Sequence, residues 1–195
     1  LRKDVVFHDG TPFNAEAMAF SVQRFMRIGT LNYILGNRIA AVETPQPFLL
    51  RLRLRRPSSS LIGLLTSVNL TPISPTAYNK NKDSFLNKSF IGTGPYRLTS
   101  FRPQQLRLEP FNRYWGNQPK NAGIDFIHLS NSTSLFGAIR SGEVDVLMSY
   151  SIDEDHHQAL YKLSTKGKLK EGEGKALEIG YITLMSKLAP LNEPL

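Results

Sequence analysis

The chain has 195 residues, of which 41% are hydrophobic, and this suits one ordinary domain or two small lobes with a packed core. Its net charge of +8, from 24 Lys and Arg against 16 Asp and Glu, raises the question of an anionic partner. The absence of cysteine excludes disulfides and thiolate chemistry, and no apolar run approaches the ~20 residues that span a bilayer. No secretion signal is visible and the first residues already suit a strand, so we expect a fragment of a longer protein.

The N-terminal segment predicts a strand, a turn and a helix in that order. Residues 5–7 are apolar and suit a short strand. Asp9-Gly10 favours a tight reversal, and Pro12 is expected to end strand pairing. Asn14 is a favourable helix N-cap, and the apolar side chains of residues 15–27 recur at helical spacing, which predicts an amphipathic helix packed on the core.

A hairpin follows, and its second strand carries the densest basic run. Residues 39–42 and 48–54 suit two strands joined around two prolines. Arginine alternates with leucine over residues 51–54, as in a half-buried strand whose outer face is basic. The other interpretation of residues 51–56 is a nucleic-acid groove. No aromatic residue interleaves with the arginines, so the solvated strand face is favoured.

Two predicted loops hold the candidate ligand contacts. Residues 29–36 predict a helix end followed by a loop that contains Asn32 and Tyr33. Farther along, two prolines predict an irregular segment that contains Asn69 and Thr71. Loops held by a rigid scaffold often carry binding residues. The competing interpretation, which the residue types favour, is that Tyr33 packs under its loop and the asparagines cap turns.

The second half predicts further strands and two helices. The expected strands span residues 96–98, 105–108, 124–129, 144–147 and 177–184, with the first two forming an antiparallel pair. Helices are expected over residues 133–140, ended by Gly142, and over residues 152–163. The strand–helix–strand run from residue 124 to residue 147 suggests a parallel unit in an open sheet.

The most specific residues of the chain shape its backbone. Gly92-Thr93-Gly94-Pro95-Tyr96 joins two glycines, which permit positive φ, to a proline that fixes φ and an aromatic anchor. Tyr114-Trp115-Gly116 suits a second turn, pinned by its rings. Neither stretch holds a catalytic group, which favours a binding scaffold over an enzyme.

Four ordered blocks of the sequence resemble a known family. Residues 1–16, with Asp9-Gly10 among them, resemble a run typical of the dipeptide-, oligopeptide- and nickel-binding proteins of ABC importers, the extracellular solute-binding proteins of family 5. Residues 92–96 match the most recognisable pentapeptide of that family, and Trp115 lies in its next block. Ser141-Gly142-Glu143-Val144-Asp145 matches a fourth block. Ala17-Met18 departs from the pattern, because an acidic residue followed by an aliphatic one is common there.

This resemblance implies a mixed α/β fold of the type II periplasmic-binding-protein class, with mixed sheets, flanking helices and the second lobe absent. Residues 1–95 would form a small extra domain that shares its N-terminal strand with the first lobe, and residues 96–195 would form part of that lobe. The implied protein binds a peptide or similar small solute in the periplasm, or otherwise outside the cytoplasm, and delivers it to ABC permease subunits without a cofactor or catalysis.

Two further expectations follow from the resemblance. An N-terminal signal outside this sequence would allow membrane anchoring. Most of the family's charged and tryptophan ligand anchors lie in the missing lobe, so we expect weak or no solute binding by these 195 residues alone.

The histidines lack the context of a catalytic or metal site. His156 and His157 are adjacent, and neighbouring side chains on a helix point about 100° apart, so they predict a solvated helix start rather than a metal cluster. His8 beside Asp9 could transfer a proton, but the surrounding motif indicates a turn. No Ser/His/Asp set has a supporting motif, and residues 92–94 lack the pattern of a phosphate-binding loop.

Two hypotheses from other classes stay open. A basic nucleic-acid or anionic-surface binding domain would explain the net charge of +8 and residues 51–56, and steep salt-dependent retention of DNA would support it. A hydrolase is the third hypothesis, and no motif supports it. The family resemblance predicts no nucleic-acid partner.

Overall fold

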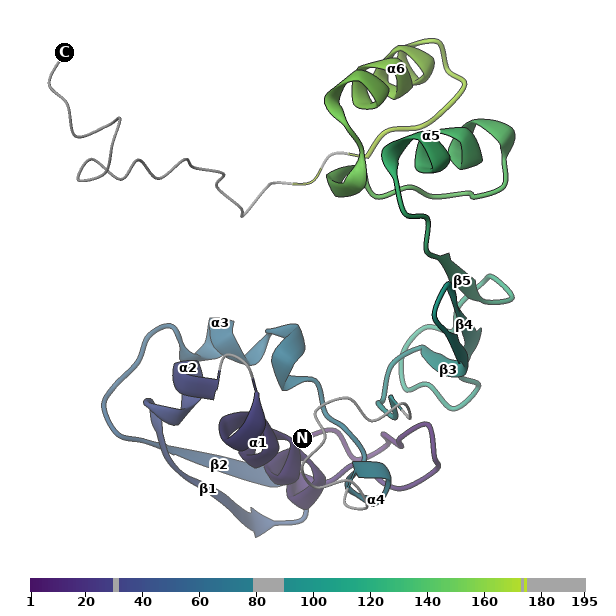
Figure 1. Ribbon diagram of the computed structural model, residues 1–195. Coiled ribbons are helices and arrows are strands. Elements are labelled where there is room, and N and C mark those ends of the chain that lie inside the picture. The colour runs from purple at the N-terminus through teal and green to yellow at the C-terminus, as the bar shows by residue number, and fades with distance from the viewer. Residues whose placement is uncertain (30–31, 79–89, 173, 175–195) are drawn as a thin grey trace, which may run out of the picture. The chain divides into compact units, whose positions relative to one another are not determined.

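The computed structural model describes residues 1–29, 32–78, 90–172 and 174, and their contacts divide the chain into two compact units (Figure 1). The first unit is Leu1–His128 and the second is Leu129–Leu195. The predicted boundary between residues 95 and 96 stays a prediction. The strand predicted over residues 177–184 lies outside the described residues.

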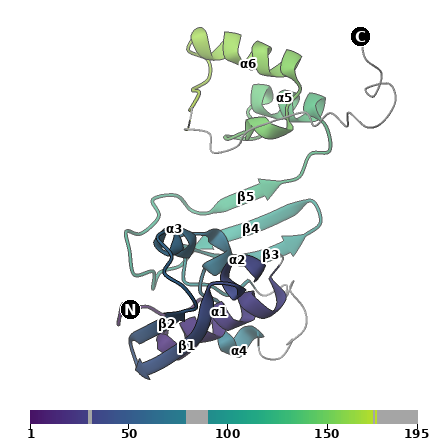
Figure 2. The same cartoon turned by 90° about the vertical axis from the view of Figure 1, so that its left-hand side faces the viewer.

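Helix α1 (Ala15–Ile28) forms where the apolar periodicity predicts it. The Asn14 side chain caps it by accepting a hydrogen bond from the Ala17 N–H at 2.9 Å. Its buried face packs on the hairpin of β1 (Ile39–Gln46) and β2 (Leu49–Leu54) (Figure 2). The core there is a cluster of four buried side chains, each at most 4% exposed: Val22, Leu35, Ile39 and Leu70.

Strand β2 confirms the interpretation of the alternating arginines. Its leucines at 52 and 54 are half-buried and pack against the core cluster, whereas Arg51 and Arg53 are exposed. Both guanidinium groups lie 3.3 Å from the carboxylate of Glu43 on β1. The outer face of the hairpin is therefore basic but locally paired.

Short elements follow the hairpin: α3 (Leu61–Leu65), the 3-10 turn η1 (Val68–Leu70) and α4 (Pro75–Tyr78).

Helix α2 (Asn32–Gly36) precedes the hairpin, so the loop predicted over residues 29–36 is wrong for residues 32–36. The physical reason is Leu35, which is 1% exposed in the core cluster. Its burial stabilises a helical turn that local propensity does not signal.

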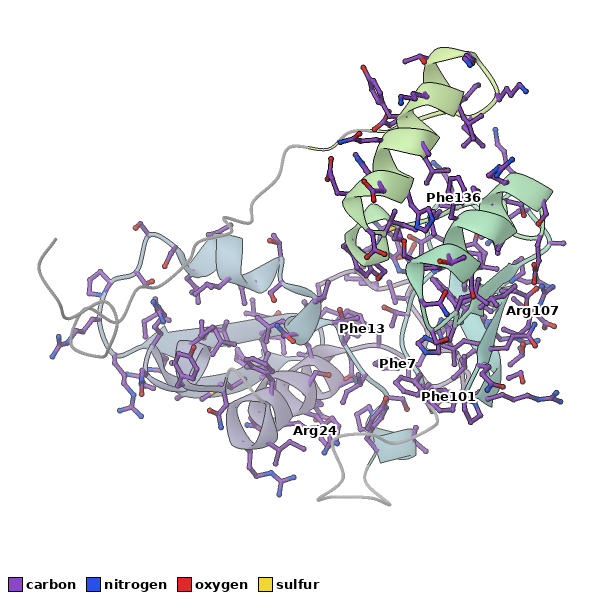
Figure 3. The ribbon with its side chains drawn as sticks, turned by 45° about the horizontal axis from the view of Figure 1, so that its top comes forward. Phe7, Phe13, Arg24, Phe101, Arg107 and Phe136 are labelled. Carbon is purple, nitrogen blue, oxygen red and sulfur yellow. The ribbon has the colours of Figure 1, made fainter. Side chains whose placement is uncertain are left out.

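Residues 5–7 form no strand, and this prediction is wrong. Only Val6 pairs, in an isolated antiparallel bridge with Pro12, the residue expected to end pairing. Backbone hydrogen bonds instead close a tight loop, from the Phe7 N–H to the Thr11 carbonyl at 2.8 Å and from the Phe13 N–H to the Val5 carbonyl at 3.0 Å. Phe7 and Phe13 meet edge to face at 6.0 Å inside this loop (Figure 3).

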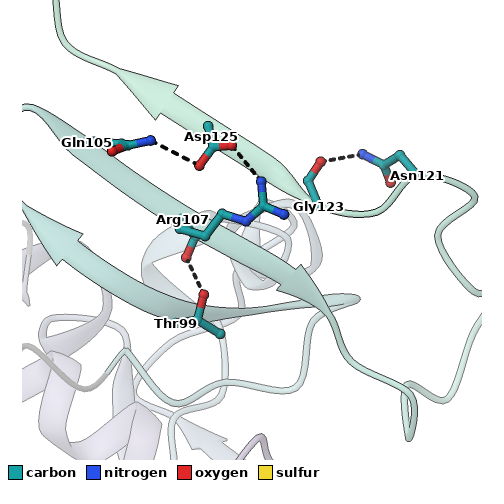
Figure 4. Close-up of polar contacts among 6 residues, drawn as sticks. All are labelled: Thr99, Gln105, Arg107, Asn121, Gly123 and Asp125. Atoms are coloured by element: carbon teal, nitrogen blue, oxygen red, sulfur yellow. Dashed lines mark hydrogen bonds and ion pairs between the residues drawn. The ribbon is translucent and has the colours of Figure 1, made fainter.

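The first unit ends in an antiparallel sheet of β3 (Tyr96–Arg102), β4 (Gln105–Pro110) and β5 (Ile124–Ile127), in that order. The predicted pairing of the first two strands is confirmed. Side chains connect all three strands (Figure 4). Thr99 of β3 donates to the Arg107 carbonyl of β4 at 3.2 Å, and the Arg107 guanidinium lies 2.5 Å from the Asp125 carboxylate on β5.

The second unit contains α5 (Ser132–Ser141), the 3-10 turn η3 (Ser149–Ser151) and α6 (Glu154–Thr165). Gly142 ends α5 in the left-handed conformation, with φ of +78°, which confirms the predicted helix stop. The strand predicted over residues 144–147 is wrong, and so is the parallel unit, because β5 pairs antiparallel with β4. A strand needs a neighbour to take its backbone hydrogen bonds, and the described residues supply none, leaving Val146 78% exposed.

Candidate functional site

His8 clamps the glycine-rich pentapeptide. Its Nε2 lies 3.0 Å from the Gly94 carbonyl oxygen, and the Gly92 N–H donates to its Nδ1 at 3.4 Å. The tautomer that satisfies both contacts carries its proton on Nε2. The ring packs edge-on against Phe111 at a centroid distance of 4.9 Å. Both ring nitrogens therefore face the backbone of the pentapeptide, which supports the turn interpretation over proton transfer.

Asp9 closes the turn beside this clamp. Its carboxylate accepts hydrogen bonds from the Thr11 N–H at 3.0 Å, the Thr11 hydroxyl at 2.6 Å and the Ser74 hydroxyl at 2.5 Å. Burial alone would raise the pKa of Asp9, but these hydrogen bonds outweigh it and hold the pKa below its usual 3.8. Gly10 has φ of +83°, which the tight reversal requires. Asp9 is thus an ionised acceptor that holds the turn.

The second aromatic block reaches the same pentapeptide. The Trp115 indole N–H donates to the Thr93 carbonyl at 3.2 Å, and the Arg2 guanidinium lies 4.5 Å from the centre of its ring. The Pro95 carbonyl accepts from the Phe111 N–H at 2.8 Å. The Tyr96 hydroxyl donates to the Asn121 side chain at 2.5 Å. Three of the four sequence blocks therefore meet at one structural joint of the first unit.

The fourth block lies in the second unit. Gly142 caps α5 there, and Asp145 is exposed on the irregular segment that follows. These two residues therefore take no part in the joint around the pentapeptide. Their match to the family's fourth block is therefore explained by the backbone turn that ends α5.

Asn32 and Tyr33 open the short helix α2 instead of lying in a loop. The Asn32 N–H donates to the Gly29 carbonyl at 3.0 Å, which ties the helix to the end of α1. Tyr33 is 59% exposed, so it does not pack under a loop as the favoured interpretation required. Its ring is available to a ligand or to another protein surface.

Asn69 and Thr71 lie in and just after the 3-10 turn η1. The Asn69 side-chain amide donates to the Ser67 hydroxyl at 3.2 Å, and the Thr71 hydroxyl donates to the Val68 carbonyl at 2.8 Å. Both side chains thus stabilise their own turn, which the competing interpretation predicted for Asn69 but not for Thr71. Both residues are also exposed, and the side-chain amide oxygen of Asn69 can still accept a hydrogen bond.

The Asn32–Tyr33 pair and the Asn69–Thr71 pair lie on elements that share one core cluster, but the two pairs form no hydrogen bond with each other. Leu35 of α2 and Leu70 of η1 both belong to the cluster beneath α1. Between them in sequence, Ile62 and Val68 are 74% and 85% exposed. The sequence prediction missed these apolar side chains. A signal was present, because residues 61–70 hold more apolar side chains than one buried face of so short a segment can use.

A serine–histidine pair joins the two helices of the second unit. His156 Nδ1 lies 2.7 Å from the Ser132 hydroxyl, and the His156 ring stacks on Phe136 at 4.6 Å. The expected solvated helix start is therefore wrong for His156, which is half-buried. The Ser132 hydroxyl also accepts the Asp153 N–H at 2.9 Å, so this buried serine is held in a packing role.

The described ranges hold no group of three or more histidine, aspartate or glutamate side chains that could bind a metal ion. Among the same residues, no helix combines the length and apolar character that a membrane crossing needs. The surface of the first unit includes one depression of about 360 Å³ and one of about 300 Å³. The larger lies beside the end of β2, and the smaller is lined by residues around Thr11 and Thr76.

Comparison with known proteins adds to this geometry. Residues 1–195 match the family described as bacterial extracellular solute-binding proteins, family 5, middle region. The chain is 26% identical over 198 residues to the probable D,D-dipeptide-binding periplasmic protein DdpA of Escherichia coli, covering 99% of this chain and 37% of that protein. It is 27% identical over 193 residues to the HTH-type transcriptional regulator SgrR of Pectobacterium atrosepticum, covering 99% of this chain and 30% of that protein.

A solved structure shares the fold. The structure of the solute-binding protein MoaA of A. tumefaciens with mannopinic acid matches 86% of this chain and 34% of its own, with a TM-score of 0.75 and 26% identity. The chain thus spans about a third of the length of the relatives it matches.

Proposed function

Because this chain belongs to family 5 of the bacterial extracellular solute-binding proteins, we propose that it acts within a protein of family length that binds a small solute. The observation that carries the proposal is the match over residues 1–195, which the fold similarity at a TM-score of 0.75 supports. The first solute class to test is a dipeptide, because a relative covered over 99% of this chain is named for D,D-dipeptides.

The proposed mechanism is capture by closure, outside the cytoplasm, without catalysis. Two lobes would close around the solute at a hinge, and ABC permease subunits in the membrane would recognise the closed state. Residues 1–95 would supply the small domain and residues 96–195 part of the first lobe. The ordered joint around the pentapeptide would then serve as a rigid frame, because closure needs lobes that move as bodies.

Within this protein, we assign solute contact to Asn32, Tyr33, Asn69 and Thr71. Tyr33 is the strongest of them, since the residue is 59% exposed on a helix whose Leu35 is buried. A rigid helix that presents an exposed tyrosine offers apolar area and one hydroxyl at low entropic cost. Asn69 and Thr71 are held by their own turn, so they would present fixed polar atoms.

Calorimetry on the family-length protein tests the proposal. A panel of dipeptides and nickel chelates should contain a solute that binds, and Tyr33→Ala should weaken that binding by about tenfold, as loss of an interface tyrosine does. Tyr161→Ala is the matched control, because Tyr161 is 54% exposed in α6 and has no assigned contact. If a solute binds and both variants bind it equally, the site assignment fails while the function stands.

Two outcomes bear on the function itself. A folded family-length protein that binds no member of a broad solute panel would refute solute binding. Micromolar dipeptide binding by the 195 residues alone would refute the expectation that the other lobe is needed. Salt-dependent retention of DNA tests the alternative function; the pairing of Arg51 and Arg53 with Glu43 argues against it, because those charges are already partly neutralised.

A further inference from the structure

The larger of the two surface depressions, of about 360 Å³, is lined by six polar residues and one proline. It lies where the segment after α2 meets the segment that runs from β2 to α3. Its lining residues are Asn37, Arg38, Arg56, Pro57, Ser58, Ser59 and Ser60. The lining holds two guanidinium groups, one amide and three hydroxyls, and no carboxylate. A surface with this composition favours an anion.

Arg38 is fixed in place on one side of the depression. Its guanidinium donates to the Ile34 carbonyl at 2.5 Å, which occupies one of its five N–H groups. Its backbone donates to the Leu35 carbonyl at 2.9 Å and accepts from the Arg55 N–H at 2.8 Å. Leu35 and Ile39 are at most 1% exposed. The remaining donors of Arg38 are therefore offered from a rigid base, which lowers the entropic cost of binding.

Arg56, which also lines the depression, carries a positive charge that the hairpin does not neutralise. Arg51 and Arg53 pair with Glu43, but no described acidic side chain forms an ion pair with Arg56. The next residues are Pro57, which fixes its own φ, and three serines. The Ser58 and Ser60 hydroxyls form a hydrogen bond at 3.3 Å, so one of them donates to the other and the second keeps its O–H for a ligand. Both serines line the depression together with Arg56.

We propose that this depression binds one phosphate group. Donors reach it from two chain segments, and guanidinium and hydroxyl groups arranged around a space suit a tetrahedral oxyanion with four acceptor oxygens. A planar carboxylate would satisfy only one guanidinium fork at a time. The group is carried either by free phosphate or by an anionic lipid headgroup. The site is independent of the proposed solute contacts, since it shares none of their residues.

Titration of the 195-residue chain with inorganic phosphate, followed by amide NMR shifts, tests the site. Shifts should concentrate at residues 37–38 and 56–60. Arg56→Gln should weaken binding about tenfold, the worth of a hydrogen bond to a charged group. Arg53→Gln, which removes the same charge from an exposed residue of the same hairpin, should change binding less than about twofold.

Vesicle binding then separates the two sources of the phosphate group. Vesicles of phosphatidylcholine with phosphatidic acid should retain the wild-type chain and the Arg53→Gln variant but not Arg56→Gln, if a lipid headgroup is the ligand. Phosphate binding without vesicle retention supports free phosphate. Equal weakening by both variants would show diffuse charge attraction and overturn the proposal, as would the absence of shifts at residues 56–60 in millimolar phosphate.

Discussion

Replacing His8 by phenylalanine isolates the hydrogen bonds of the clamp from its packing. Phenylalanine keeps a ring beside Phe111, where the centroids are 4.9 Å apart, but it can neither donate to the Gly94 carbonyl nor accept from the Gly92 N–H. The substitution therefore tests whether His8 holds the pentapeptide or merely fills space. We expect it to loosen the joint while the surrounding elements stay folded.

The magnitude follows from the two distances. The contact to the Gly94 carbonyl is 3.0 Å, within the usual range, whereas the Gly92 contact is 3.4 Å and adds little. One hydrogen bond contributes about 1 kcal/mol net to the free energy of unfolding. Loss of the His8 donor also leaves the part-buried Gly94 carbonyl with part of its desolvation cost uncompensated. His8→Phe should thus lower the free energy of unfolding by about 1–2 kcal/mol. His8→Ala, which also loses the ring contact, should lower it further.

Trp115 makes the assay specific, because it is the single tryptophan of the chain and its indole donates to Thr93 inside the pentapeptide. Urea unfolding followed by tryptophan fluorescence should show a lower midpoint for His8→Phe than for wild type. His128→Phe is the control, since His128 is exposed and its only described hydrogen bond is made by its backbone. Equal midpoints for wild type and His8→Phe would refute the clamp.

Three further predictions concern acid, base and core. Hydrogen bonds hold the pKa of Asp9 in the folded state below 3.8. Ionised Asp9 therefore contributes stability that is present above pH 3.8 and is lost as the pH falls through the folded pKa. Asp9→Asn should reduce the fall of the urea unfolding midpoint at acid pH. Burial raises the pKa of Tyr78 above 10.0, and the charge of Arg24 opposes this only in part. The neutral Tyr78 side chain therefore contributes stability that is complete below pH 10.0 and is lost as the pH rises through the folded pKa. Tyr78→Phe should reduce the fall of the urea unfolding midpoint at alkaline pH. Leu35→Ala should lower the unfolding free energy by about 2–5 kcal/mol, while Ile62→Ala, at 74% exposure, should change it by less than about 0.5 kcal/mol; equal losses would contradict the observed core.

Elements whose signals are local could be predicted from the sequence. Asn14 caps α1 because its side chain needs only the Ala17 N–H three residues away, and the apolar spacing of the helix is itself local. The alternation of arginine and leucine in β2 likewise encodes which face is buried. Gly142 ends α5 through its own backbone conformation. In each case the residues that decide the structure are neighbours in sequence.

Elements decided by distant contacts could not be predicted. Helix α2 forms because Leu35 packs with Val22, Ile39 and Leu70, and no pattern within five residues reports that cluster. Residues 144–147 have strand-like composition but no neighbouring strand in the described part of the chain. The candidate site also depends on distant contacts. Tyr33 was expected to pack under its loop, but it is exposed. Its exposure depends on the orientation of α2, which the same distant contacts set.

The residues that carry the family resemblance in the first unit differ from the proposed solute contacts, and the clamp gives a physical reason for this. The residues that carry the resemblance in the first unit make internal contacts: Asp9 with Thr11 and Ser74, Gly94 with His8, and Trp115 with Thr93. A side chain whose donors and acceptors are satisfied inside the fold has little left to offer a ligand. Under the proposed function, discrimination among solutes falls to side chains that the fold leaves exposed, such as Tyr33. Exchanging Tyr33 should therefore change which solute binds, whereas exchanging His8 should change whether the frame holds together.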